Sequence, residues 1–269
     1  MNYIPNENLV KKITINTLAQ MKKRQEKIAM LTCYDASFAQ LMNLAGIDVI
    51  LIGDSLGNVI QGHSSTLPVS LEDMLYHTKN VVRGNSRCFL ITDMPFGTYD
   101  DEKSAFNNAV KLMQSGCNMI KIEGTNWTKD IVEYLTTRSI PVCSHLGLMP
   151  QSINSLGSFR QQATNEEDAN KLLADAKLLE KSGSQMLLFE AIPSDLMHKI
   201  TQDLSVPTIG IGAGKSADGQ VLVLNDVLGI FTGKAPSFSK NYLDGSRNLT
   251  ILEAINNYVK EVKEGVFPS

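Results

Sequence analysis

The chain has 269 residues, of which 43% are hydrophobic, and its 25 Lys and Arg against 28 Asp and Glu give a formal net charge of −3. A chain of this length can bury a large core without disulfides or a structural metal. The near-neutral charge argues against a nucleic-acid or anionic-membrane partner, and the longest strongly apolar stretches, such as 49–52, are far too short to span a bilayer.

Short apolar runs alternate along the chain with longer amphipathic segments. Eight of these runs have the length of a strand, and near-continuous apolar strands are typical of a parallel sheet that is covered on both faces. The runs lie at 28–32, 48–54, 88–93, 119–123, 141–145, 186–190, 207–212 and 221–224.

The amphipathic segments predict helices between the strands and at both ends of the chain. Ser70 and Asp73 have the spacing of a capping box, and several of the segments stop at or just before a glycine. The expected helices lie at 14–27, 38–45, 74–82, 105–114, 167–181 and 249–263. Repeated strand–helix units predict an α/β fold with a closed (β/α)₈ TIM barrel, a single domain over 1–269. An open doubly wound sheet is the alternative.

The termini and cysteines bear on the compartment. Residues 1–8 hold no basic region that leads into an apolar stretch, so no secretory signal is expected. The four cysteines, at 33, 88, 117 and 143, stand singly in or beside apolar runs, which is typical of reduced thiols in core strands. We therefore expect a cytoplasmic protein.

Ionisable residues recur where the predicted strands end. These residues are Asp54, Asp93, Glu123, His145 and Glu190. Any one of them could be a turn or helix-cap residue, since Asp favours those positions. In a barrel, however, the carboxyl ends of the strands build the active site. Their repetition at five strand ends therefore predicts one shared catalytic mouth.

Three of these acids, Asp54, Asp93 and Glu123, have only oxygen ligands to offer, which suits a hard cation such as Mg²⁺. The alternative is a set of ion pairs with Lys121, which lies on the same face of its strand as Glu123. A lysine that faces a barrel interior is costly unless it is paired, and it would be well placed to bind a substrate carboxylate. Glu190 is then available as a general base.

Eight motifs, in order and at the expected separations, resemble the 3-methyl-2-oxobutanoate hydroxymethyltransferase (ketopantoate hydroxymethyltransferase) family. The resemblance runs from about Thr14 to Pro268. The motifs are GDSLG at 53–57, QGH at 61–63, STLPV at 65–69, KIEG at 121–124, HLGL at 145–148, PQS at 150–152, IGIGAG at 209–214 and DGQVLV at 218–223.

This resemblance implies a step of pantothenate (coenzyme A precursor) biosynthesis. A hydroxymethyl group passes from 5,10-methylenetetrahydrofolate to 3-methyl-2-oxobutanoate through a Mg-stabilised enolate, which gives 2-dehydropantoate and tetrahydrofolate. It also implies a Mg²⁺-dependent barrel of the phosphoenolpyruvate/pyruvate group, assembled as a cytoplasmic homodecamer. By motif, Asp54, Asp93 and Glu123 match the metal positions, Asp54, Ser55, Asp93 and Lys121 match the oxo-acid contacts, and Glu190 matches the proton acceptor.

One stretch departs from the family pattern. Residues 157–163 read GSFRQQA where the family has a loop like GGYKVQG. Arg160 keeps the positive charge and Phe159 keeps an aromatic ring, whereas glycines are replaced at Ser158 and Ala163. The departure bears on lid geometry and folate affinity and leaves the metal site alone.

Two other functions remain open from the sequence. One is a Mg²⁺-dependent carbon–carbon lyase or aldolase of the same barrel group, because a fold alone does not specify its reaction. The other is a non-catalytic barrel that binds an oxo acid or folate. Folate dependence of turnover separates the hydroxymethyltransferase from the lyase or aldolase, and product formation separates both enzymes from the non-catalytic barrel.

Overall fold

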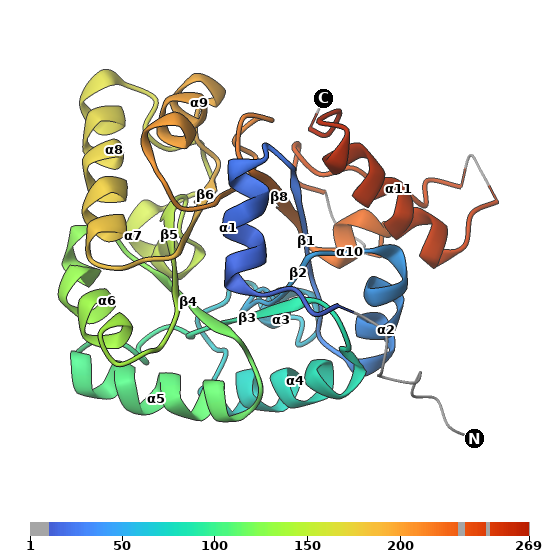
Figure 1. The fold of residues 1–269 in the computed structure, drawn as a ribbon, viewed down its shortest axis with the longest axis horizontal. Coiled ribbons are helices and arrows are strands. Elements are labelled where there is room, and N and C mark those ends of the chain that lie inside the picture. Colours follow the sequence, from blue (N-terminus) through green and yellow to red (C-terminus); the bar gives the residue numbers. More distant parts are fainter. Residues whose placement is uncertain (1–10, 231–234, 246–247, 269) are drawn as a thin grey trace.

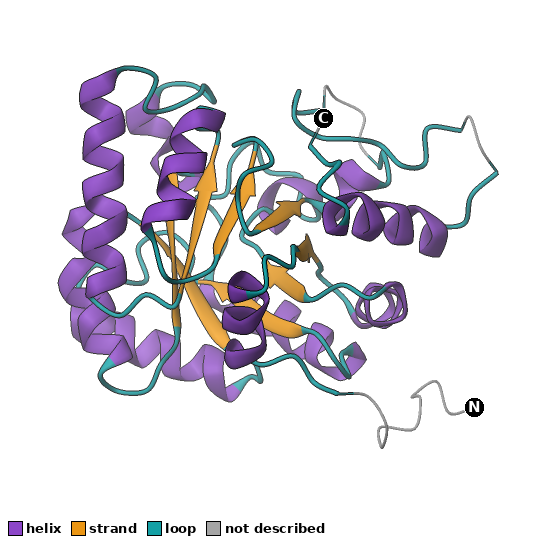
Figure 2. Cartoon of the chain, turned by 45° about the horizontal axis from the view of Figure 1, so that its top comes forward, coloured by secondary structure: helices purple, strands orange, loops and turns teal. Residues whose placement is uncertain are grey.

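Eight parallel strands form a closed barrel in the computed structural model, which describes residues 11–230, 235–245 and 248–268. The strands follow one another around the ring in chain order, and β8 pairs with β1. Figure 2 shows them at the centre of the molecule with helices around them. The predicted TIM barrel is confirmed. The strands are β1 (Ile28–Thr32), β2 (Val49–Ile52), β3 (Phe89–Asp93), β4 (Met119–Glu123), β5 (Val142–Gly147), β6 (Met186–Glu190), β7 (Thr208–Ile211) and β8 (Gly219–Leu222).

Each of the six segments predicted to be helical contains a helix, although α4 already starts at Leu71 and α1 ends at Lys23 (Figure 1). The helices α6 and α9 were not predicted, and short helices lie in several loops. The capping box of Ser70 and Asp73 is formed at the start of the fourth helix. The helices are α1 (Ile15–Lys23), α2 (Ala36–Ala45), α3 (Leu56–Val59), α4 (Leu71–Gly84), α5 (Glu102–Gln114), α6 (Lys129–Thr136), α7 (Ile153–Leu156), α8 (Glu166–Lys181), α9 (Ser194–Asp203), α10 (Leu224–Val227) and α11 (Ile251–Lys263).

The last strand differs from its prediction. Residues 221–224 were expected, but β8 begins at Gly219 and ends at Leu222, and Leu224 already starts α10. A Cβ on Gly219 would lie 2.6 Å from the carbonyl oxygen of Ile28, so the pairing with β1 requires glycine there. Because neither Gly219 nor Gln220 carries an apolar side chain, hydrophobic patterning misses the start of this strand.

Helix α1 closes the amino-terminal end of the barrel. Its Leu18 and Met21 belong to the same buried apolar cluster as side chains of the barrel interior, such as Met30 and Ile91. A second cluster fills the space between the strands and the outer helices. The mouth at the carboxyl ends of the strands is thereby left as the open end. All four cysteines are buried and free, as predicted.

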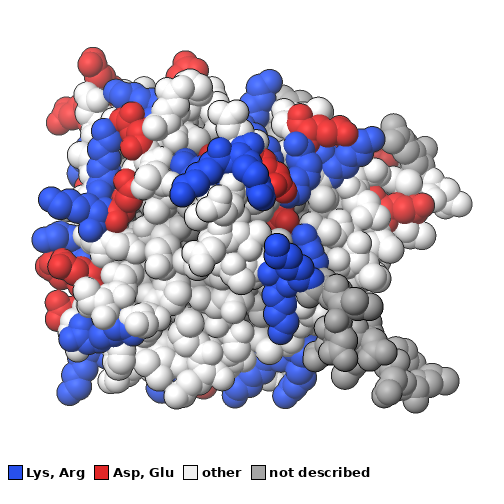
Figure 3. Space-filling view, in the orientation of Figure 1, with Lys and Arg blue, Asp and Glu red and all other residues white. Residues whose placement is uncertain are grey.

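No helix in the described part of the chain is long and apolar enough to cross a bilayer. Lys and Arg are interspersed with Asp and Glu over the face drawn in Figure 3.

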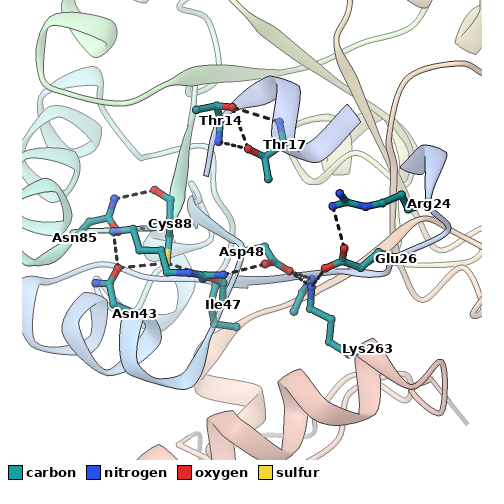
Figure 4. A network of polar contacts seen from close by, with 12 residues as sticks. Thr14, Thr17, Arg24, Glu26, Asn43, Ile47, Asp48, Asn85, Cys88 and Lys263 are labelled. Carbon is teal, nitrogen blue, oxygen red and sulfur yellow. Dashed lines mark hydrogen bonds and ion pairs between the residues drawn. The ribbon is translucent and has the colours of Figure 1, made fainter. Parts of the chain in front are cut away.

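A polar network ties α11 to the closed end of the barrel (Figure 4). The buried Asp48, just before β2, accepts hydrogen bonds at Oδ2 from the backbone N of Ala29 at 3.0 Å and pairs there with Lys263 at 2.6 Å. Its other oxygen is 3.5 Å from Arg87, and Lys263 also lies 3.5 Å from Glu26. One carboxylate thus joins the strand β1, the loop before β3 and the end of α11.

We expect Asp48→Ala to lower the free energy of unfolding by about 2–3 kcal/mol, because the buried backbone N–H and the partly buried cations lose their acceptor. Urea denaturation measures the loss. Glu264→Ala, which removes an exposed pair with Lys260 at 4.0 Å, is the control and should cost less than about 0.5 kcal/mol. Equal effects of the two substitutions would show that the network contributes nothing.

Candidate active site

The barrel brings the predicted acids together at its mouth. Asp93 ends β3 and is in register with Lys121 of β4, and Glu123 of β4 is in register with His145 of β5. Lys121 and Glu123 are two residues apart, so both side chains point to the same face of β4. All four side chains are at most 4% exposed. The strand-end pattern therefore produces a buried polar cluster at the open end of an otherwise apolar barrel.

The Lys121 ammonium is central to this cluster. Its Nζ is 3.2 Å from Asp93 Oδ1, 3.7 Å from Glu123 Oε1 and 3.2 Å from Nδ1 of His145. Burial alone would lower the pKa of Lys121, but Asp93 and Glu123 raise it above its usual value, so the lysine is charged. Burial, together with Lys121, lowers the pKa of His145, which keeps the imidazole neutral at pH 7. The ion pairs that the sequence left open as an alternative to a metal are present.

Asp54 and Ser55, in the loop just after β2, complete the cluster. The backbone N of Asp54 donates to Oδ2 of Asp93 at 3.0 Å, which orients that carboxylate. Burial and the neighbouring carboxylates Asp93 and Glu123 raise the pKa of Asp54 well above its usual value. The Ser55 hydroxyl lies 2.9 Å from the hydroxyl of Tyr34 and lines the same cavity.

Gln151 is a site residue for which sequence reasoning assigned no role. Its backbone N donates to Glu123 Oε2 at 3.0 Å, and its Nε2 donates to Asp54 Oδ2 at 2.8 Å. The Tyr99 hydroxyl donates to Gln151 Oε1 at 2.5 Å and so fixes the orientation of the amide. Gln151 therefore holds two carboxylates that come from different strands. Its only sequence signal was its place in the PQS motif, because polarity alone does not distinguish a buried glutamine from a solvent-exposed one.

Glu190 ends β6, beside His145. Its Oε2 is 3.5 Å from His145 Nε2, and its side chain is 16% exposed, more than the rest of the cluster. Burial, with a contribution from Glu123, raises the pKa of Glu190 to about 8. The next residue, Ala191, has a φ of +49°, so the chain turns sharply where this carboxylate enters the mouth. A carboxyl group with such a raised pKa is suited to proton transfer near neutral pH.

A cavity of about 880 Å³ covers the cluster. It is lined by all six residues predicted for the site, together with His145. Phe159, Arg160 and Gln161 of the divergent loop line it as well, and the next residue, Gln162, donates its backbone N to the carbonyl of Ala191 at 2.8 Å. The loop is thereby joined to the turn after Glu190. The volume of the cavity is within the usual range for small-molecule sites.

The three carboxylates of the cluster could together bind a divalent cation. Asp54, Asp93 and Glu123 set three carboxylates against the one ammonium of Lys121, an excess of two negative charges when all are ionised. Oδ1 of Asp93 is buried and, beside its ion pair with Lys121, accepts no hydrogen bond. In the described part of the chain, no three His, Cys, Asp or Glu side chains form a ready-made metal centre. An open site, in which water and substrate oxygens complete the coordination that the carboxylates begin, fits both facts and is characteristic of Mg²⁺.

Comparison with known sequences gives one consistent result. The model of the family described as "Ketopantoate hydroxymethyltransferase" matches residues 12–269. A protein of Paraburkholderia phymatum named 3-methyl-2-oxobutanoate hydroxymethyltransferase is 52% identical over 256 residues, which cover 95% of this chain and 94% of that protein. A protein of Nitrosospira multiformis with the same name is 52% identical over 258 residues, 96% of this chain and 97% of that one.

Solved structures share the fold at low sequence identity. A phosphonopyruvate hydrolase in complex with oxalate and Mg²⁺ has a TM-score of 0.61 at 10% identity and covers 96% of this chain and 100% of its own. A 2,3-dimethylmalate lyase of the phosphoenolpyruvate mutase/isocitrate lyase superfamily has a TM-score of 0.57 at 14% identity, over 77% of this chain and 80% of its own. At these identities the likeness concerns the barrel itself.

Proposed function

The chain belongs to the ketopantoate hydroxymethyltransferase family, and we propose that its barrel mouth transfers a hydroxymethyl group from 5,10-methylenetetrahydrofolate to 3-methyl-2-oxobutanoate. In this reaction the C3–H bond of the oxo acid is replaced by a bond to CH₂OH, water supplies the hydroxyl oxygen, and tetrahydrofolate leaves. The observation that carries the proposal is the buried cluster of Asp54, Asp93, Lys121 and Glu123 with Glu190 beside it, in a chain whose residues 12–269 match the family model.

The oxo acid would bind over Lys121. A buried ammonium that already offsets carboxylates is suited to orient the substrate carboxylate, and Ser55 and the backbone around Asp54 complete the contacts. Asp54, Asp93 and Glu123 would hold Mg²⁺. When bound, the ion supplies a Lewis acid that withdraws electron density from the keto oxygen as C3 loses its proton.

Glu190 would remove that proton. It is the carboxylate of the cluster that is farthest from full burial, and among the described residues neither Lys121 nor another ammonium forms an ion pair with it. Its raised pKa brings its basicity closer to that needed for a carbon acid. The resulting nucleophilic carbon then forms its bond to the one-carbon unit of the folate, which the cavity must hold next to C3.

The homodecamer and the cytoplasmic location implied by the resemblance also stay predictions. The mass of the purified protein in solution tests the number of subunits, and cell fractionation tests the location.

Two assays test the proposed function. Purified protein supplied with both substrates and Mg²⁺ should form 2-dehydropantoate, and in deuterated water it should exchange the C3 proton of 3-methyl-2-oxobutanoate without any folate. Cleavage of another 2-oxo acid without folate would identify a lyase of the same barrel group instead. Binding of the oxo acid with neither exchange nor product would identify a non-catalytic barrel.

Lys121→Met tests the oxo-acid contact. The substitution keeps the aliphatic stem and removes the ammonium, so we expect the affinity for 3-methyl-2-oxobutanoate to fall about 10- to 150-fold, the size of a lost charge-assisted hydrogen bond. Calorimetric titration measures it, and Lys129→Met, on the exposed start of α6, is the control. Unchanged affinity in Lys121→Met would make this lysine a purely structural ion-pair partner.

A further inference from the structure

The cavity extends beyond the oxo-acid cluster toward the end of β8. Around the ring, the cluster uses residues from β2 to β5, and Glu190 comes from β6. The remaining wall, contributed by the ends of β7 and β8 and the segments after them, is mostly apolar and includes Ile211, Val223, Pro236 and Phe238. A folate is far larger than the oxo acid, and this is the side of the cavity that the oxo-acid contacts leave free.

One carboxylate interrupts this apolar wall. Asp226 lies in α10, four residues after the end of β8, and lines the cavity. Burial alone raises the pKa of Asp226 to about 6, and no charged side chain contributes to the shift, so it belongs to a different electrostatic environment from the Lys121 cluster. Within the described ranges, no side chain forms an ion pair with it. It remains ionised at pH 7.5 and can accept hydrogen bonds from a ligand.

Phe238 provides a flat apolar surface in the same part of the cavity. Its ring lies against Gly212 at the end of β7, where a Cβ would be 2.7 Å from Phe238 Cδ1. Gly212 has a φ of +60°, a conformation that favours glycine, so the chain both turns and leaves room for the ring here. A glycine in the IGIGAG motif thus sets the position of an aromatic side chain in the cavity wall.

We propose that Asp226 binds the 2-amino-4-oxopyrimidine edge of the pterin ring of the folate co-substrate, with Phe238 against the face of that ring. This assignment rests on the proposed function, since it takes the folate to be the second ligand of the cavity.

The chemistry of the ring supports this orientation. The N3–H and the 2-amino group of a reduced pterin form a parallel pair of N–H donors, which matches the two oxygens of a carboxylate. A planar heterocycle gains further from an aromatic neighbour in a largely apolar wall. The charged groups of the Lys121 cluster suit an oxo-acid carboxylate, whereas an isolated carboxylate suits a neutral ring with two N–H donors. The Lys121 side of the cavity therefore matches the oxo acid, and the Asp226 side matches the pterin ring.

Asp226→Asn tests the assignment, because it keeps the volume and removes the charge and one acceptor. We expect the affinity for tetrahydrofolate, measured by anaerobic calorimetry, to fall about 10- to 100-fold. Folate-independent exchange of the C3 proton of 3-methyl-2-oxobutanoate should stay at the wild-type rate. Asp195→Asn, on the exposed first turn of α9, is the matched control and should leave both unchanged.

A fragment separates the two halves of the folate. N-(4-aminobenzoyl)-L-glutamate carries the tail without the pterin, and its affinity should be the same in the wild type and in Asp226→Asn. Unaltered tetrahydrofolate affinity in the variant would overturn the assignment, and so would an equal loss for the tail fragment, which would place the tail at Asp226. Failure of the proposed function has a separate signature, the absence of C3 exchange and product in the wild type.

Discussion

Asp93→Asn is expected to weaken Mg²⁺ binding in the presence of 3-methyl-2-oxobutanoate by more than about 100-fold and to abolish turnover. Loss of an outer-shell partner alone costs about 10- to 100-fold in metal affinity, and Asp93 would be a direct ligand. Its buried Oδ1 accepts no hydrogen bond and is paired with the Lys121 ammonium at 3.2 Å, and its Oδ2 accepts from the backbone N of Asp54. The asparagine can still accept the hydrogen bond from the backbone N of Asp54 and removes only the charge, so the barrel itself should stay folded.

Calorimetric titration of Mg²⁺ with and without the oxo acid measures this effect. Asp100→Asn is the control, because Asp100 is exposed and outside the cavity lining, and it should bind the ion as the wild type does. If Asp93→Asn and the wild type bind the ion equally well, the cluster is a set of ion pairs around Lys121 and the ion binds elsewhere.

The barrel and much of the candidate site could be predicted from the sequence because both depend on periodic patterns. Strand-length apolar runs separated by amphipathic segments identified seven of the strands closely, and β8 was displaced only because Gly219 and Gln220 carry no apolar signal. Once the strands were placed, their carboxyl ends predicted that Asp93, Glu123 and Glu190 would meet. The rule works because the closed ring forces all the strand ends to one mouth.

Contacts made by loop residues could not be predicted in the same way. Gln151 lies in a short helical turn after β5, and its donation to Asp54 joins positions 97 residues apart in sequence. The arrangement of Phe238 against Gly212 likewise depends on how a loop folds back over β7. Such contacts have no period in the sequence, so only the three-dimensional arrangement shows them.

Glu190→Gln is expected to lower turnover by about 10²- to 10⁴-fold, the usual size of a general-base contribution, while the oxo acid and Mg²⁺ still bind. The amide keeps the shape of the side chain and cannot accept the C3 proton. Exchange of that proton in deuterated water, followed by NMR without folate, isolates this step from one-carbon transfer. His145→Gln is the comparison, because its Nε2 is only 3.5 Å from Glu190 and imidazole is the other group there that could act as a base.

The pH dependence of this exchange distinguishes the two groups further. Burial, with the charge of Glu123, raises the pKa of Glu190, and the ammonium of Lys121 opposes that rise, with a resulting value of about 8. Since only the ionised carboxylate accepts a proton, exchange should increase with pH up to about 8, and bound Mg²⁺ should move the increase to lower pH. The pKa of His145 is lowered instead, by burial and by Lys121, so an imidazole base would already be unprotonated and active at neutral pH. Wild-type exchange in Glu190→Gln together with its loss in His145→Gln would transfer the role of base to His145.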